Sequence, residues 1–140
     1  MKNIKLKLIA LFTLSIGYTS CSNDDENTEN NAPTISIQSP ELNQTYIGYW
    51  GGAWPDGDKI IVKALGTDED KVTSMNLTVK NADGTVVLDK TINNTTNNDK
   101  ALTISESFEP TDAGNYNVIF SATDINGNIE TSKPRFFLVK

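Results

Sequence analysis

The sequence has 140 residues, with 12 Lys or Arg, 18 Asp or Glu and no His, so its formal net charge at pH 7 is −6. An acidic chain lacks the basic face that nucleic acids and anionic lipids require of a partner. The absence of His excludes Ser-His-Asp and Cys-His catalysis and His-based zinc sites.

The first twenty residues have the pattern of an export signal. Lys2, Lys5 and Lys7 precede an apolar run at 8–17, and Cys21 follows shortly after that run. The run is too short to cross a bilayer, which needs about 20 apolar residues. A positive start, a short apolar segment and a small residue before a break predict a secretory signal over residues 1–20.

Cys21 is the only cysteine of the chain, so it cannot form an internal disulfide. Residues 14–21, with Ser20 directly before Cys21, resemble the lipobox of bacterial lipoproteins. Residues 22–26 (SNDDE) resemble the acidic export signal of Bacteroidetes lipoproteins. The resemblance implies that Cys21 becomes the first mature residue, carries lipid and anchors the protein in the outer membrane, facing outward.

Loss of the signal would remove three basic residues and no acidic one, which makes the net charge of the mature chain −9. Residues 22–31 contain no large apolar side chain, so we expect residues 21–32 to be a lipidated cysteine followed by a disordered acidic tether. A flexible segment of this length reaches roughly 17–20 Å. Residues 33–140 are then enough for one domain with a single core.

Short alternating runs recur through residues 33–140, and none has helical periodicity. The turn sequences 81–84 (NADG) and 126–127 (NG) supply the positive φ that tight hairpins need. Seven or eight strands at even spacing indicate a β-sandwich or a barrel. The predicted strands are 34–38, 59–64, 75–79, 85–91, 102–108, 116–122 and 135–139.

One local motif favours the sandwich. Asp112, Gly114 and Tyr116 form an Asp-x-Gly-x-Tyr turn before the strongest strand, which resembles the tyrosine corner of immunoglobulin-type domains, in which the hydroxyl bonds back to the backbone of the turn. Val118 replaces the cysteine of antibody domains. Residues 33–140, with 121–128 (SATDINGN) as a hairpin, resemble bacterial immunoglobulin-like and fibronectin III-like modules. We therefore predict an all-β, immunoglobulin-like β-sandwich of seven to eight antiparallel strands.

The alternation also predicts the core. In the last strand the predicted inward-facing pair is Phe136 and Leu138, and a shift of one residue would exchange this pair for Phe137 and Val139. The predicted core residues are Ile35, Ile37, Ile60, Val62, Ala64, Met75, Leu77, Val79, Leu102, Ile104, Phe108, Tyr116, Val118, Phe120, Phe136 and Leu138.

Acidic clusters are the candidates for catalysis or metal binding. The clusters 56–58 and 68–70 lie in loops beside small polar residues, with no apolar neighbours to raise a pKa, so we predict that the protein is not an enzyme. In an immunoglobulin topology two loops meet at the N-terminal end, and their Asp and Asn oxygens suit Ca²⁺. Ordinary turn chemistry explains the same residues and is favoured. The candidate calcium ligands are Asp68, Asp70, Asp124, Asn126 and Asn128, with Glu69 beside them.

The segment 48–58 (GYWGGAWPDGD) holds both tryptophans of the chain. The same topology places this loop at the end opposite the N-terminus. Tyr49, Trp50 and Trp54 could form a platform for a glycan or a protein, since Trp and Tyr are favoured at binding hot spots. One or both indoles could instead cover the open end of the core, because exposed tryptophans are costly.

The sequence thus predicts a lipid-anchored cell-surface binding module without catalysis and without a cofactor, with calcium as the less favoured alternative considered above. Its ligand would be a glycan or another envelope protein, and Tyr49, Trp50 and Trp54 would contact it. The alternative is a structural accessory, a spacer subunit of an envelope assembly.

Overall fold

The computed structural model describes residues 31–48, 57–96 and 99–140, and in these ranges it contains strands and no helix. None of the described residues therefore belongs to a helix long and apolar enough to cross a lipid bilayer. The strands are β1 (Thr34–Ser39), β2 (Thr45–Tyr46), β3 (Ile60–Thr67), β4 (Val72–Lys80), β5 (Val86–Asn93), β6 (Ala101–Phe108), β7 (Gly114–Asp124), β8 (Ile129–Thr131) and β9 (Arg135–Val139).

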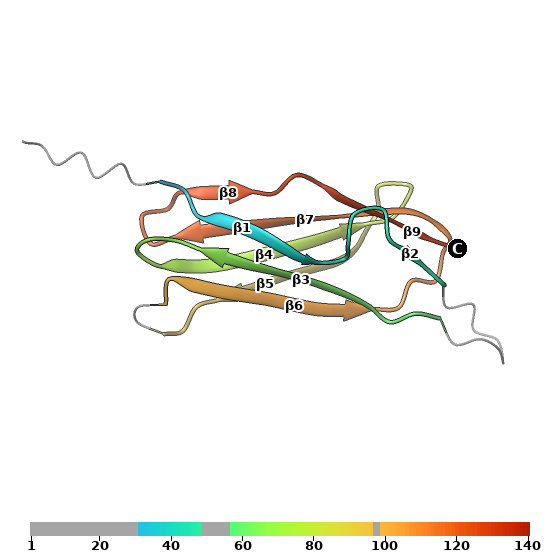
Figure 1. Cartoon of the computed structure of the whole chain (residues 1–140), viewed down its shortest axis with the longest axis horizontal. Coiled ribbons are helices and arrows are strands. Elements are labelled where there is room, and N and C mark those ends of the chain that lie inside the picture. Colours follow the sequence, from blue (N-terminus) through green and yellow to red (C-terminus); the bar gives the residue numbers. More distant parts are fainter. Residues whose placement is uncertain (1–30, 49–56, 97–98) are drawn as a thin grey trace, which may run out of the picture.

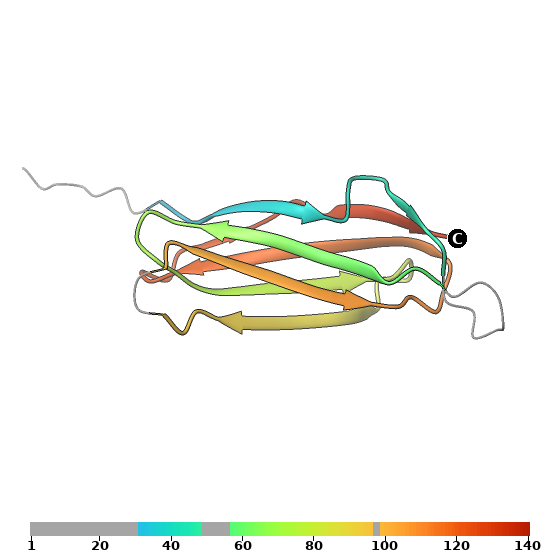
Figure 2. The same cartoon turned by 60° about the horizontal axis from the view of Figure 1, so that its bottom comes forward.

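The strands form two sheets that pack face to face (Figures 1 and 2). The smaller sheet has the order β1-β3-β6, and the larger sheet has the order β2-β9-β7-β4-β5, with β8 also pairing with β7. All pairs are antiparallel except β2 with β9, which is parallel. The predicted immunoglobulin-like β-sandwich is confirmed, although two short strands, β2 and β8, bring the described strands to nine.

The strands form where apolar and polar side chains alternate, because successive side chains of a strand point to opposite faces. In β7 every second residue from Tyr116 to Asp124 is buried. The hairpin between β4 and β5 turns at Gly84, which has φ +80, and Asn81 Oδ1 accepts hydrogen bonds from the backbone of Asp83 and Thr85 at 3.1 and 2.9 Å. The predicted Asp-Gly turn is therefore present.

The tyrosine corner is also present. The Tyr116 hydroxyl donates to the carbonyl oxygen of Asp112 at 2.9 Å, across the turn that leads into β7. Gly114, inside that turn, has φ +143, a conformation that side chains with a Cβ rarely adopt. The turn and the buried strand are thus fixed to one another.

The core lies between the two sheets and largely matches the predicted set. Ten predicted residues are buried, and Ile35, Ile37, Leu102 and Phe108 pack partly buried against them. Val72 and Ala122 are buried but were not predicted. The ten are Ile60, Val62, Ala64, Met75, Leu77, Val79, Ile104, Tyr116, Val118 and Phe120.

For the last strand, the predicted inward-facing pair is wrong, and the alternative register, shifted by one residue, is correct. Phe137 and Val139 are buried, whereas Phe136 is 50% exposed and Leu138 is only partly buried. The reason is the register of β9, which places Phe137 opposite Tyr116, so both rings face the core. Phe136 consequently faces outward.

Candidate functional site

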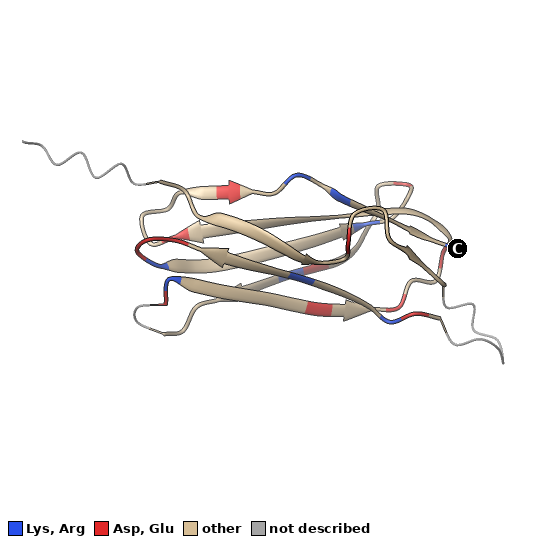
Figure 3. Ribbon diagram, in the orientation of Figure 1, with Lys and Arg blue, Asp and Glu red and all other residues tan. Residues whose placement is uncertain are grey.

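The loops that carry the candidate calcium ligands lie together at the end of the sandwich where β1 begins (Figure 1). The backbone N–H of Ile125, in the β7–β8 turn, donates to the carbonyl of Lys71 at 3.0 Å. The N–H of Asp68 donates to the carbonyl of Lys100 at 2.8 Å. Three connections, β3–β4, β5–β6 and β7–β8, are thereby joined at one end, where Figure 3 shows both acidic and basic residues.

Asp124 organises the β7–β8 turn rather than facing solvent. Its Oδ1 accepts from the backbone N–H groups of Asn126 and Asn128, both at 2.8 Å, and its Oδ2 accepts from Asn128 Nδ2 at 2.7 Å. Burial raises the pKa of Asp124, but the hydrogen bonds from Asn128, Asn126 and Gly127 outweigh burial and hold the pKa below its usual value. Both carboxylate oxygens therefore already have donors in the turn.

The other calcium candidates lie near this turn. Asn126 Nδ2 donates to Asp70 Oδ2 at 3.4 Å, and Asp68 Oδ1 accepts from the N–H of Asp70 at 2.9 Å. Within the described ranges, no group of three or more acidic or thiol side chains is close enough to hold a metal ion. The turn contacts account for these residues, and a calcium site stays a prediction.

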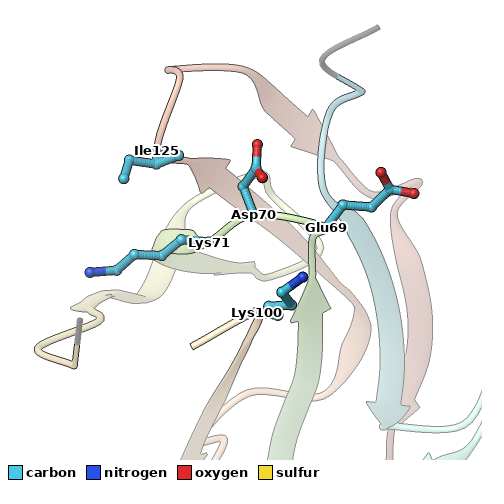
Figure 4. A pocket seen from close by; sticks show the side chains of 5 residues that line it. All are labelled: Glu69, Asp70, Lys71, Lys100 and Ile125. Carbon is cyan, nitrogen blue, oxygen red and sulfur yellow. The ribbon is translucent and has the colours of Figure 1, made fainter. Parts of the chain in front are cut away.

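A shallow pocket of about 460 Å³ opens at the same end (Figure 4). It is lined by Glu69, Asp70, Lys71, Lys100 and Ile125. The lining consists of two carboxylates, two ammonium groups and one exposed isoleucine, so it carries no net charge that would select an anion or a cation.

The opposite end holds the two flanks of the tryptophan segment. The N–H of Ile47 donates to Asp58 Oδ2 at 2.7 Å, and the N–H of Asp58 donates to the Ile47 carbonyl at 2.8 Å. The N–H of Gly48 donates to the Lys140 carbonyl at 2.8 Å. These bonds hold both flanks beside the C-terminus (Figure 1). Tyr49, Trp50 and Trp54 themselves lie outside the described residues, as does Cys21.

A further polar cluster, not predicted from the sequence, lies on the solvent side of the larger sheet. Asn76 Nδ2 donates to Asp89 Oδ1 at 3.1 Å and to Thr91 Oγ1 at 3.0 Å, and the Thr78 hydroxyl donates to Asp89 Oδ1 at 2.9 Å. Hydrogen bonds from Asn76 and Thr78 lower the pKa of Asp89. The alternation of β4 and β5 indicated outward positions for these residues, but it did not indicate that they bond across the two strands.

Comparison with known proteins supports the fold. No family model and no curated protein match the sequence. Among solved structures, the chain is similar to the fibronectin(III)-like modules of Clostridium thermocellum CbhA, with a TM-score of 0.52 and 17% identity over 76% of this chain and 46% of that chain. It is also similar to an engineered protein, with a TM-score of 0.54 and 20% identity over 79% of this chain and 21% of that one. The chain thus spans less than half of either structure, and the similarity establishes a fibronectin III-like sandwich.

Proposed function

We propose that the protein is a lipid-anchored module of the bacterial outer membrane that faces outward and binds a ligand without catalysis. The anchor is Cys21, and residues 22–31 tether the domain to it. The proposal of binding without catalysis is supported by the absence of His from the sequence and by the engagement of Asp124 in its turn. The fibronectin III-like fold is consistent with a binding or structural module, but similar folds carry many functions.

The observation that carries the proposal is the position of the segment that bears both tryptophans. Its two flanks are fixed by hydrogen bonds at the end of the sandwich opposite the start of β1. A tether attached before β1 leaves that far end the most accessible to a ligand. Tyr49, Trp50 and Trp54 are therefore the proposed contact residues, for a glycan or a protein.

Tryptophan fluorescence tests this proposal directly, because the chain has only two tryptophans and both lie in this segment. The full chain, purified in detergent, is titrated with iodide and then with soluble polysaccharides. We expect emission at long wavelength that iodide quenches and that one ligand shifts or protects. Blue-shifted emission that neither iodide nor any ligand alters would contradict the proposal.

A second candidate, a spacer subunit of an envelope assembly, is favoured by one feature of the larger sheet. Val86 and Val87 are adjacent, 50% and 43% exposed, on β5, which ends the strand order of that sheet. An apolar edge strand is a common site for pairing with another chain. If chemical crosslinking in the intact envelope yields one partner, and Val87→Lys abolishes that product, the spacer function would replace ligand binding. The variant Ile61→Lys, on the smaller sheet, is the control because Ile61 is 51% exposed.

A further inference from the structure

The larger sheet has a solvent-facing side whose composition is set by the pleat. In β4 the buried residues Met75, Leu77 and Val79 alternate with Asn76, Thr78 and Lys80, which therefore point outward. In β7 the outward positions between buried residues include Asn117, Ile119 and Ser121. We call this side, from Phe136 on β9 to Thr91 on β5, the outer face.

The register of the sheet aligns the outer-face residues into rows that cross the strands. One row runs from Phe136 through Asn117 to Lys80, which are successive Cα partners. A neighbouring row runs from Ile119 through Thr78 to Asp89. The next row joins Ser121, Asn76 and Thr91.

The rows spread an exposed ring, amides, hydroxyls, an ammonium group and a carboxylate over four strands. Because adjacent strands lie about 4.8 Å apart, the face extends about 14 Å from β9 to β5.

Four polar side chains of this face, all on β4 and β5, are already fixed in place. Asn76 and Thr78 both donate to Asp89 Oδ1, and Asn76 also holds the Thr91 hydroxyl oxygen. No hydrogen bond between described residues uses Asp89 Oδ2, which remains available as an acceptor. Groups that neighbours hold in place lose little conformational freedom on binding, which favours recognition of a polar ligand.

Phe136 supplies the aromatic ring of the face. Its ring is half-exposed at the end of the first row, beside Asn117. A sugar ring presents hydroxyls at its rim and C–H groups on its flat side, so it can accept and donate hydrogen bonds while one side packs on an aromatic ring. A protein partner fits this face less well, because Lys and Asp are depleted in protein interfaces and the face carries both Lys80 and Asp89.

We propose that the outer face binds a carbohydrate. Phe136 packs on one sugar ring, and the sugar hydroxyls form hydrogen bonds with the side chains of Asn117, Lys80, Asp89 and Asn76. The inference rests on the proposed binding function and names its ligand class, but it does not depend on the tryptophan-bearing segment. The two surfaces are therefore separable by mutation.

Affinity electrophoresis of the full chain in native gels tests this inference, with soluble dextran, laminarin, xylan and galactomannan as the probes. The two test variants are Phe136→Ala and Asp89→Asn. Ile61→Ala is the matched control, because Ile61 is as exposed as Phe136 but lies on the smaller sheet. Circular dichroism establishes that each variant is folded.

We expect at least one polysaccharide to retard the protein, with binding weakened about tenfold in Phe136→Ala, the change that loss of one ring contact produces, and unchanged in Ile61→Ala. Retardation that survives in both test variants but is lost in Trp50→Ala or Trp54→Ala would overturn the inference while supporting the proposed function. If none of the four polysaccharides retards the protein, the inference is also overturned, and the fluorescence experiment still decides the proposed function.

Discussion

The tyrosine corner allows a quantitative test of how this domain is stabilised. Tyr116 is 2% exposed, and its ring stacks on Phe137 with centroids 5.6 Å apart. The substitution Tyr116→Phe keeps the ring and removes only the hydroxyl, which donates to the Asp112 carbonyl at 2.9 Å. The variant therefore isolates one hydrogen bond from the packing around it.

A neutral hydrogen bond of this kind contributes about 1 kcal/mol to the free energy of unfolding. For a domain of this size, that loss lowers Tm by about 4 °C. The acceptor is a backbone carbonyl, so Asp112→Ala should keep the bond and change Tm little. Thermal unfolding followed by circular dichroism measures both variants. An unchanged Tm for Tyr116→Phe, or an equal loss for Asp112→Ala, would refute the reasoning.

We also expect the difference in stability between the wild type and Tyr116→Phe to depend on pH in the alkaline range. Burial raises the pKa of Tyr116 above its ordinary value of 10.0, and the nearby charge of Asp112 raises it further. A group whose pKa is raised by folding stabilises the fold fully below the unfolded pKa, and this contribution is lost as pH rises through the folded pKa. The stability advantage of the wild type over Tyr116→Phe should therefore shrink above pH 10, as urea unfolding at each pH can measure.

Three further predictions concern the turns and the outer face. Gly114→Ala should lower the free energy of unfolding by about 1–3 kcal/mol, because the φ of Gly114 is +143 and the new Cβ would lie 3.0 Å from Ala82 Cβ. Gly84→Ala is the control, because Gly84 has φ +80 but no atom within 4 Å of the new Cβ, so the variant carries backbone strain without the contact. An equal loss of the free energy of unfolding in the two variants, measured by urea unfolding, would contradict a role for the contact. Thr78→Val should raise the pKa of Asp89 by removing one hydrogen-bond donor, and a carboxyl ¹³C NMR titration in which this pKa is unchanged would contradict the prediction. Because folding depresses the pKa of Asp89, the resulting stabilisation is present above the unfolded pKa and is lost as pH falls through the folded pKa. The wild type and Thr78→Val should therefore become equally stable in acid. The Tm of the full chain should be the same in calcium and in EGTA if turn contacts alone organise Asp124; a Tm raised by calcium, and not raised in Asp124→Asn, would establish the calcium site instead.

The sequence predicted the strands that alternate over five or more residues, because a buried face imposes a period of two. It did not predict β2 and β8, which have two and three residues and offer no such pattern. Val72 was missed because the register shifts between Val72 and Ser74, which breaks the period of two that holds from Met75 onward. The polar cluster around Asp89 could not be predicted, since it depends on which residues of β4 and β5 lie opposite one another.

The register of β9 decides which of the adjacent residues Phe136 and Phe137 faces the core. Hydrophobicity alone cannot decide between Phe136 and Phe137, and the choice is made by the rings around Phe137. Tyr116 stacks on it, Tyr46 meets it edge-on with centroids 5.7 Å apart, and Phe108 lies 6.3 Å away. Phe137 is therefore the core residue, and the core gives no reason for an aromatic residue at the position before it. Phe136 is half-exposed and is not needed to fill the core, so the affinity electrophoresis of Phe136→Ala measures its contribution to binding on the outer face without removing a core side chain.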